Sequence, residues 1–305
     1  MNFRQCIEQQ HSILMEGALG ERLKREYNLQ LDDNVALAKL VYDSDGQFAL
    51  KSIWQEYIEI AKAYQLPFMA TTPTRRANKE RVERAGCDAS IITDNVRFLR
   101  GISQESQIEM YIGGLMGCKG DAYTGIDALS ENDAQFFHSW QAKLFAMENV
   151  DFLFAGIMPT LPEAAGMAKA MEDTGIPYII SFTIQSDGRL IDGTSIHDAI
   201  AYIDGVVSVK PTCYMTNCVH PRIVEEALSK SFNQSNLVKK RFLGIQANTS
   251  LLSYGELDGS IDLKCSDPES FAEDLMSLKS ISNIKIFGGC CGTDNRHMEQ
   301  VARRL

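Results

Sequence analysis

Short apolar runs rich in β-branched and aromatic residues alternate along the chain with longer amphipathic segments. Eight such runs predict strands, at 13–16, 67–72, 110–115, 151–157, 177–184, 212–217, 242–247 and 284–287. Several of them are apolar at consecutive positions, as expected where both faces of a strand are covered. The segments between them follow helical spacing, most clearly at 47–65, where apolar residues form one stripe. This alternation predicts parallel strands joined by crossover helices.

The order of these elements predicts an α/β fold, a single (β/α)8 TIM barrel that spans 1–305 as one domain. No repeat, low-complexity run or flexible linker divides the chain. A doubly wound open sheet is the alternative, and it would need a Gly-x-Gly-x-x-Gly turn after the first strand. The turn at 16–21 lacks that spacing and carries acidic residues, so dinucleotide binding is not expected.

The charge balance narrows the range of partners. The 305 residues contain 30 Lys and Arg against 40 Asp and Glu, a formal net charge of −10. This balance argues against nucleic acid as a main partner. No apolar stretch approaches the length of a membrane span, and the first residues lack the apolar core of a secretion signal. We therefore expect a cytoplasmic protein in which none of the eight cysteines needs to form a disulfide.

Three cysteines follow predicted strands. Cys290 and Cys291 lie between glycines that permit a sharp turn, and Cys218 ends another strand. Three thiolates with one open position are typical of catalytic zinc, while a redox pair or simple packing remain as alternatives. Cys213 is five residues before Cys218 and is excluded as a ligand, because it should face the opposite way. His220 stays open as a ligand. The remaining cysteines are interpreted as buried filler: Cys6, Cys87, Cys118 and Cys265.

The motifs at 14–20, 216–218 and 288–293 together resemble the zinc-dependent homocysteine S-methyltransferase family. Weaker similarity continues at 71–73, 113–117, 181–183 and 192–194, in the order that the family shows. The resemblance therefore covers almost the whole chain. It depends on the double-cysteine motif together with the Asn-Cys pair some seventy residues upstream, since neither is specific alone.

The resemblance implies a barrel whose Zn²⁺ is held by Cys218, Cys290 and Cys291, with the fourth position open to a substrate thiol. The implied reaction is methyl transfer to homocysteine, giving methionine, and no catalytic residue beyond the zinc site is needed. The partners are then a small thiol acceptor and a methyl donor, for which S-methylmethionine or betaine is the simplest choice. A homo-oligomer, or a corrinoid protein that supplies the methyl group, is left open.

Two positions depart from the family pattern. Glu16 stands where the family usually has an Asp that helps to hold the amino group of homocysteine. Gly156 stands where the family has a second acid, which puts the identity of the acceptor thiol in doubt. Glu21 or Glu163 could compensate for that acid. A non-catalytic zinc barrel and a redox role for the cysteine pair are the rival interpretations.

Polar residues at predicted strand ends are candidates for substrate contact. Besides Glu16, these are Thr72, Asn217 and Asn248, and for each of them a loop-stabilising role is an equal alternative. The segment 250–266 could also line the barrel mouth, through Tyr254 and Glu256.

Overall fold

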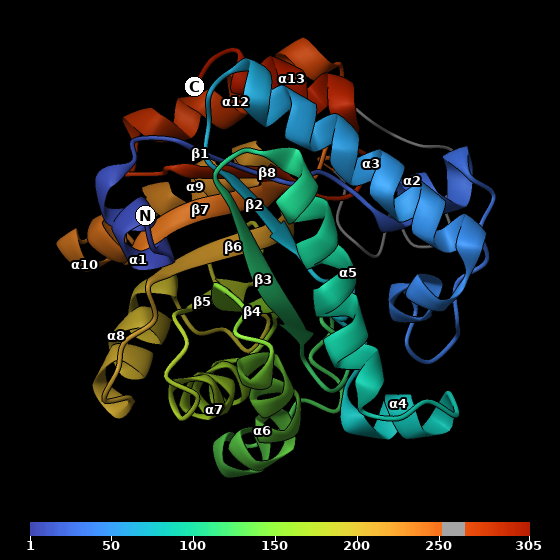
Figure 1. Ribbon diagram of the computed structural model, residues 1–305. Helices are drawn as coiled ribbons and strands as arrows, with labels where there is room; N and C mark the ends of the chain where they lie inside the picture. Colours follow the sequence, from blue (N-terminus) through green and yellow to red (C-terminus); the bar gives the residue numbers. More distant parts are fainter. Residues whose placement is uncertain (252–265) are drawn as a thin grey trace.

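Parallel strands form a closed barrel in the computed structural model, which describes residues 1–251 and 266–305 (Figure 1). The strands are β1 (Ile13–Met15), β2 (Phe68–Thr71), β3 (Met110–Gly117), β4 (Phe152–Met158), β5 (Tyr178–Phe182), β6 (Cys213–Val219), β7 (Phe242–Ala247) and β8 (Ile286–Gly289). Each strand pairs with the next in the chain, and β1 pairs with β8, where Ile13 lies opposite Ile286. The predicted (β/α)8 barrel is thereby confirmed.

All eight predicted strands are present, and their ends differ by a few residues. The prediction for β7 matches its observed bounds, Phe242–Ala247. The prediction for β8 began and ended two residues early, because the observed strand starts at Ile286, where it pairs with Gly244 of β7. The partners of a strand decide where its ladder begins, and the apolar run alone does not show them.

Helices surround the barrel (Figure 1). They are α1 (Phe3–Gln9), α2 (Gly20–Glu26), α3 (Ser44–Ala63), α4 (Lys79–Arg84), α5 (Ser90–Ser106), α6 (Glu131–Met147), α7 (Leu161–Glu172), α8 (Ile196–Val206), α9 (Pro221–Ser229), α10 (Asn236–Arg241), α12 (Pro268–Ser277) and α13 (Asn295–Ala302), with 3-10 turns η1 (Leu37–Tyr42) and η2 (Leu278–Ser280). Ser195 caps α8 and Asp267 caps α12. The helix predicted at 47–65 is α3, which begins three residues earlier because Asp43 caps it.

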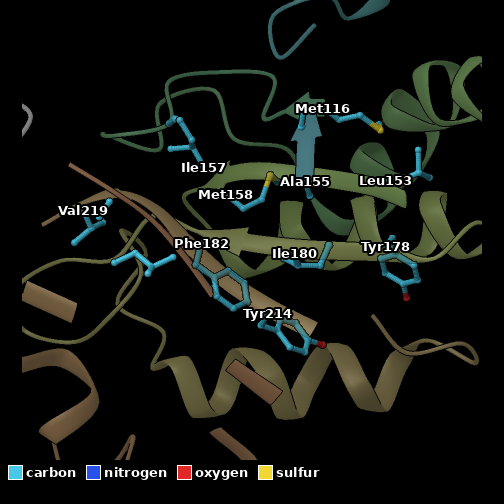
Figure 2. Close-up of a cluster of buried hydrophobic side chains, with 14 of the residues drawn as sticks. Met116, Leu153, Ala155, Ile157, Met158, Tyr178, Ile180, Phe182, Tyr214 and Val219 are labelled. Atoms are coloured by element: carbon cyan, nitrogen blue, oxygen red, sulfur yellow. The ribbon is translucent and has the colours of Figure 1, made fainter. Parts of the chain in front are cut away.

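Strand side chains alternate between two apolar layers. Leu153 and Ala155 of β4 point outward to the helix layer, together with Tyr178 and Ile180 of β5 (Figure 2). Phe152 and the other inward-facing residues fill the barrel. Both faces of the strands are buried, which explains their uninterrupted apolar runs.

The N-terminal helix closes one end of the barrel. Phe3, Cys6 and Ile7 of α1 belong to the interior cluster, and the Phe3 ring stacks on Phe152 with centroids 4.4 Å apart. The opposite end, where the strands finish, therefore remains as the place for a site, as in other barrels of this type. Within the described residues, no helix combines the length and apolarity that a membrane crossing requires.

Candidate functional site

Three cysteine sulfurs converge at the C-terminal end of the barrel. Cys218 lies near the end of β6, and Cys290 and Cys291 directly follow β8. The Cys218 sulfur is 2.7 Å from that of Cys290 and 3.7 Å from that of Cys291. Across the described part of the chain, these three form the group of His, Cys, Asp and Glu side chains close enough to share one metal ion, with all sulfurs within 4.8 Å of one another.

An irregular backbone brings Cys218 into this group. Its φ of 62° is left-handed, and the register between β6 and β7 shifts from Asn217 to Val219. A left-handed residue other than glycine is uncommon, and it marks a place where the fold overrides local preference. The bulge turns the Cys218 side chain toward the end of β8, which strict strand alternation would not do.

A left-handed glycine shapes the other half of the site. Gly292 has φ +83°, and a Cβ built there would lie 2.0 Å from Oγ1 of Thr249. The backbone N–H of Gly292 donates to the Glu21 carboxylate at 2.6 Å, and the N–H of Thr249 donates to the carbonyl of Cys291 at 3.1 Å. Glycine is therefore required at position 292 for two reasons: the backbone conformation is left-handed, and a side chain would have no space.

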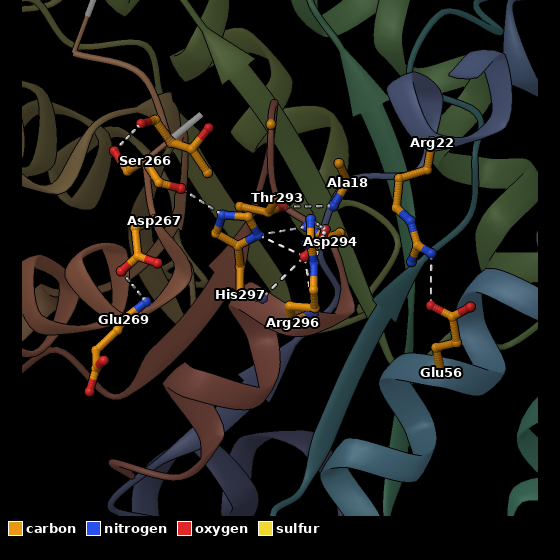
Figure 3. Close-up of polar contacts among 12 residues, drawn as sticks. Ala18, Arg22, Glu56, Ser266, Asp267, Glu269, Thr293, Asp294, Arg296 and His297 are labelled. Carbon is orange, nitrogen blue, oxygen red and sulfur yellow. Dashed lines mark hydrogen bonds and ion pairs between the residues drawn. The ribbon is translucent and has the colours of Figure 1, made fainter. Parts of the chain in front are cut away.

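The turn is fastened to the start of the barrel and to α13 (Figure 3). The Thr293 hydroxyl donates to the Cys290 carbonyl at 2.7 Å and accepts the Ala18 N–H at 3.0 Å. Asp294 caps α13 and contacts the His297 ring at 2.7 Å. These bonds fix the direction in which Cys290 and Cys291 leave β8.

The three cysteines differ in the direction in which their pKa values are shifted. Hydrogen bonds from Cys290 and Cys291, and a further one from Tyr123, hold the pKa of Cys218 well below its ordinary value. The hydrogen bond to Cys218 and its negative charge raise the pKa values of the other two thiols well above theirs. A cation that binds all three as thiolates would therefore displace protons chiefly from Cys290 and Cys291.

The donor set fits zinc. Sulfur-only ligation favours Zn²⁺ over Mg²⁺ or Ca²⁺, which prefer oxygen. Sulfurs bound to one tetrahedral zinc at about 2.3 Å lie about 3.8 Å apart, close to the 3.7 Å between Cys218 and Cys291. The sulfurs of Cys218 and Cys290 are closer, at 2.7 Å, and would have to move apart to bind the same ion. Three sulfur ligands from two strand ends would leave the fourth position of a tetrahedral ion open.

Glu16 follows β1 and is buried. Its Oε1 accepts from the backbone N–H of Thr71 at 2.9 Å and from the Thr71 hydroxyl at 2.6 Å, while Oε2 accepts from the Trp54 indole at 2.6 Å. Burial raises the pKa of this carboxyl to about 7, although the bonds from Thr71 and Trp54 oppose the rise. Glu16 therefore ties β1 to β2 and α3, in addition to any contact with a substrate.

The other candidate substrate contacts also hold backbone. Thr72 is buried, and its Oγ1 accepts the N–H of Leu115 at 3.1 Å. Asn217 Oδ1 accepts from the N–H of Ile157 at 2.9 Å and from the Ser181 hydroxyl at 2.7 Å. The structure thus assigns each of these two side chains a structural partner, and their contact with a substrate remains a prediction.

Asn248 differs from them, because half of its amide is unsatisfied. Its Nδ2 donates to the carbonyl of Cys218 at 2.9 Å. Its Oδ1 is buried and has no hydrogen-bond partner within the described residues. A buried amide oxygen beside a ligand candidate is suited to accept a bond from a bound molecule.

Gly156, at the expected place of the second acid, has little free space. A Cβ there would lie 2.8 Å from Leu115 Cδ1 and 3.6 Å from Asn217 Nδ2. Glu163 of α7 does not compensate, because its buried carboxylate is engaged elsewhere: it accepts the N–H of Lys119 at 2.7 Å and contacts the His138 ring at 3.0 Å. Glu21 lies next to the cysteine turn, through its bond to Gly292.

Neither Cys213, which was excluded as a ligand, nor His220, which was left open, belongs to the cysteine group. Cys213 lies in the barrel interior at the start of β6, remote from the cluster, as expected. His220 caps α9, where its Nδ1 accepts the N–H of Arg222 at 3.2 Å, and it does not join the cysteines. Three residues considered above lie outside the described residues: Tyr254, Glu256 and Cys265.

Sequence reasoning missed two residues near the thiols. Tyr123, in the loop after β3, hydrogen-bonds to Cys218, and the charge of Arg75, after β2, further lowers the pKa of that cysteine. Neither residue belongs to a motif, and a tyrosine in a long loop carries no local signal. Only the closure of the barrel places the loops after β2, β3 and β6 around one point.

The chain is similar to a known protein family and to solved structures. A family model described as homocysteine S-methyltransferase matches residues 13–305. The metallated form of the homocysteine methyltransferase MmuM from Escherichia coli superposes with a TM-score of 0.76 at 18% identity, covering 98% of both chains. Its oxidized form gives a TM-score of 0.79 at 18% identity over 99% of both chains. At such identities the structures show that the fold is shared.

Proposed function

The chain belongs to the homocysteine S-methyltransferase family, and we propose that it transfers a methyl group from an activated donor to the thiol of homocysteine, giving methionine. The resemblance expected from the motifs is thereby confirmed, and the chain is an S-methyltransferase. One observation carries the more specific proposal: three cysteine sulfurs within 4.8 Å of one another at the C-terminal end of the barrel. We assign Cys218, Cys290 and Cys291 as ligands of Zn²⁺.

When bound, zinc would supply the Lewis acidity that lets a substrate thiol lose its proton at neutral pH. Thr293 and Glu21 fasten the turn that carries Cys290 and Cys291, and the bulge in β6 presents Cys218. The thiol proton leaves to solvent, a carbon–sulfur bond forms, and the bond from the methyl carbon to the donor breaks with its electron pair on the departing group. No side chain is required as a general base for that transfer.

The substrate's amino acid portion needs polar partners beside the sulfurs. Asn248 supports such a contact, because its buried Oδ1 would accept an ammonium N–H. Glu16 supplies the acidic group of the family pattern, and Asn217 and Thr72 complete the set that we propose for substrate binding. Because the position of the second acid is Gly156, we expect weaker selection for homocysteine over other thiols.

Zinc-edge X-ray absorption on reduced protein tests the proposal. We expect three sulfur ligands at about 2.3 Å, and a fourth when homocysteine is added. Replacement of Cys218 by Ala should abolish zinc binding and methyl transfer together. Replacement of Cys213 by Ala, on the same strand but in the barrel interior, should leave both intact.

Other results would replace the proposal with one of its rivals. If the number of sulfur ligands stays at three when homocysteine is added, the acceptor is another thiol or the barrel is not catalytic. A methyl-transfer assay with a panel of thiols separates these two cases. Absence of zinc with a reversible two-electron titration would indicate a redox pair. Turnover that requires a methylated corrinoid protein would identify that partner.

We place the protein in the cytoplasm, since free thiol ligands need a reducing compartment.

A further inference from the structure

A cavity lies at the same end of the barrel as the thiols. It has a volume of about 710 Å³ and is bounded by α4, the segment before it, and the loop after β3. This volume lies in the range of small-molecule sites. Five cationic side chains line it, a set that we call the arginine pocket: Arg75, Arg76, Arg81, Arg84 and Lys119. They gather in one cavity of a chain whose net charge is −10.

The acidic residues of the pocket do not neutralise this charge. Glu80 pairs with both Arg84 and Lys119, at 3.4 Å in each case. The Asp121 carboxylate accepts two backbone N–H groups of its own loop at 2.8 Å. Asp127 lines the cavity without an ion pair in the described part of the chain. The pocket therefore keeps an excess of positive charge.

Three arginines carry that excess. Within the described residues, no carboxylate lies at ion-pair distance from Arg75, Arg76 or Arg81. Arg76 Nε is buried and has no hydrogen-bond partner there, and Arg81 reaches only the carbonyl of Lys119, at 3.4 Å. Burial, followed by the charges of Arg76 and Arg75, lowers the pKa of Arg81. Arg76 Nη2 donates to the carbonyl of Asp33 at 3.4 Å. Guanidinium groups that repel one another and lack carboxylate partners are stabilised when an anion enters between them.

The arginine pocket adjoins the thiol site through one shared residue. Tyr123 lines the pocket and also hydrogen-bonds to Cys218. The stem of Arg75 lies across the end of β3, where a Cβ on Gly117 would be 2.7 Å from its Cγ. A molecule in the pocket that contacts Tyr123 would thus lie one side chain away from Cys218.

We propose that the arginine pocket binds the phosphate or carboxylate groups of a small anionic molecule, and that this molecule is the methyl donor. The second half rests on the proposed function. A single cavity with paired guanidinium groups suits a compact oxyanion, since guanidinium binds phosphate and carboxylate in a bidentate manner.

Titration calorimetry with pyrophosphate and with citrate tests the pocket without turnover. We expect at least one of them to bind, more weakly as ionic strength rises. Removal of Arg75 and Arg81 together, as Gln, should weaken binding at least a hundredfold, about tenfold for each charge-assisted bond lost. The two probes distinguish a phosphate-bearing from a carboxylate-bearing ligand. The matched control replaces Arg97 and Arg100 of α5 by Gln, which removes the same charge outside the pocket.

Alkylation of Cys218 by iodoacetamide tests whether the pocket reaches the thiols. A bound anion should slow modification several-fold in the native protein and leave the rate unchanged in the Arg75→Gln, Arg81→Gln variant. Absence of binding by both probes, or equal binding by variant and native protein, would overturn the site. Arginine-dependent binding without slower alkylation would overturn the assignment of the ligand as donor. Failure of zinc binding or methyl transfer would leave the calorimetric result standing.

Discussion

Oδ1 of Asn217 accepts the backbone N–H of Ile157 at 2.9 Å, and this bond joins two left-handed bulges. Ile157 has φ 56° near the end of β4, and Cys218, the residue after Asn217, has φ 62° near the end of β6. Ser181 of β5, the strand between them, donates to the same oxygen at 2.7 Å. One side chain therefore sets the conformation of three strand ends, one of which presents a candidate zinc ligand.

Replacement of Asn217 by Ala should leave two buried donors unsatisfied and cost about 1 to 3 kcal/mol of the free energy of unfolding. Zinc affinity should fall with it, because the Cys218 bulge loses its support. Urea unfolding and competition with a chelator measure the two effects. In a Ser181→Ala background the loss should be smaller, since one donor is already gone. Equal losses in both backgrounds would show that the Asn217–Ser181 bond contributes nothing.

Gly292 offers a test of the cysteine turn with an internal control. Replacement by Ala at φ +83° meets both backbone strain and Oγ1 of Thr249 at 2.0 Å, so zinc binding should be lost. Gly193 has φ +84° but no atom within 4 Å of its Cβ position. In the Gly193→Ala variant, the strain of the left-handed conformation should lower the free energy of unfolding by only about 1 to 2 kcal/mol, and zinc binding should be kept. Similar losses of stability and zinc in both variants would refute the steric argument.

The fold was predictable because it depends on patterns that are local. Apolar runs marked each strand, and one apolar stripe at helical spacing marked α3. The three cysteines were predictable because two of them are adjacent and flanked by glycine. The bulge at Cys218 was not, since it arises from the register with β7 and from the bond between Asn217 and β4.

The polar surroundings of the site were largely beyond the sequence. The partners of Glu16 are 38 and 55 residues away, at Trp54 and Thr71, and no pattern in the chain connects them. The arginine pocket likewise joins residues before and within α4 to the loop after β3. In the sequence these arginines are indistinguishable from a solvated helix surface, and only their lack of carboxylate partners in the structure sets them apart.

Glu16 should make stability depend on pH. Its pKa of about 7 in the folded protein exceeds the ordinary value of 4.5, so the folded state binds more protons between these two values. Stability should therefore fall as pH rises through that window, by up to about 3 kcal/mol. Replacement by Gln removes this contribution, so the advantage of the native protein over the variant should shrink from pH 5 to pH 8. Urea unfolding of the reduced, metal-free proteins measures it, and an advantage that grows would mean the carboxylate is already ionised at pH 5.

Gly156 allows the missing acid to be restored. The Gly156→Asp side chain would collide with Leu115 Cδ1, 2.8 Å from the Cβ position, so Leu115→Ala is introduced with it. A new carboxylate facing a substrate ammonium contributes about 1.5 to 3 kcal/mol, and we expect the KM for homocysteine to fall at least tenfold with little change in kcat. The Gly156→Asn, Leu115→Ala protein is the uncharged control. If both variants bind homocysteine equally well, the acid position plays no part in selecting the acceptor.

Cys218 should be the most reactive thiol of the metal-free protein. Hydrogen bonds from Cys290, Cys291 and Tyr123 lower its pKa, while the pKa values of Cys290 and Cys291 are raised, so Cys218 has the largest thiolate fraction of the three. Mass spectrometry after brief exposure to iodoacetamide should find label first on Cys218. Replacement of Tyr123 by Phe should raise that pKa and slow labelling near pH 6 by up to about tenfold, the effect of one hydrogen bond to a charged group. Tyr202→Phe, which removes a surface bond to Glu131, should change nothing, and equal rates in all three proteins would show that Tyr123 does not act on the thiolate.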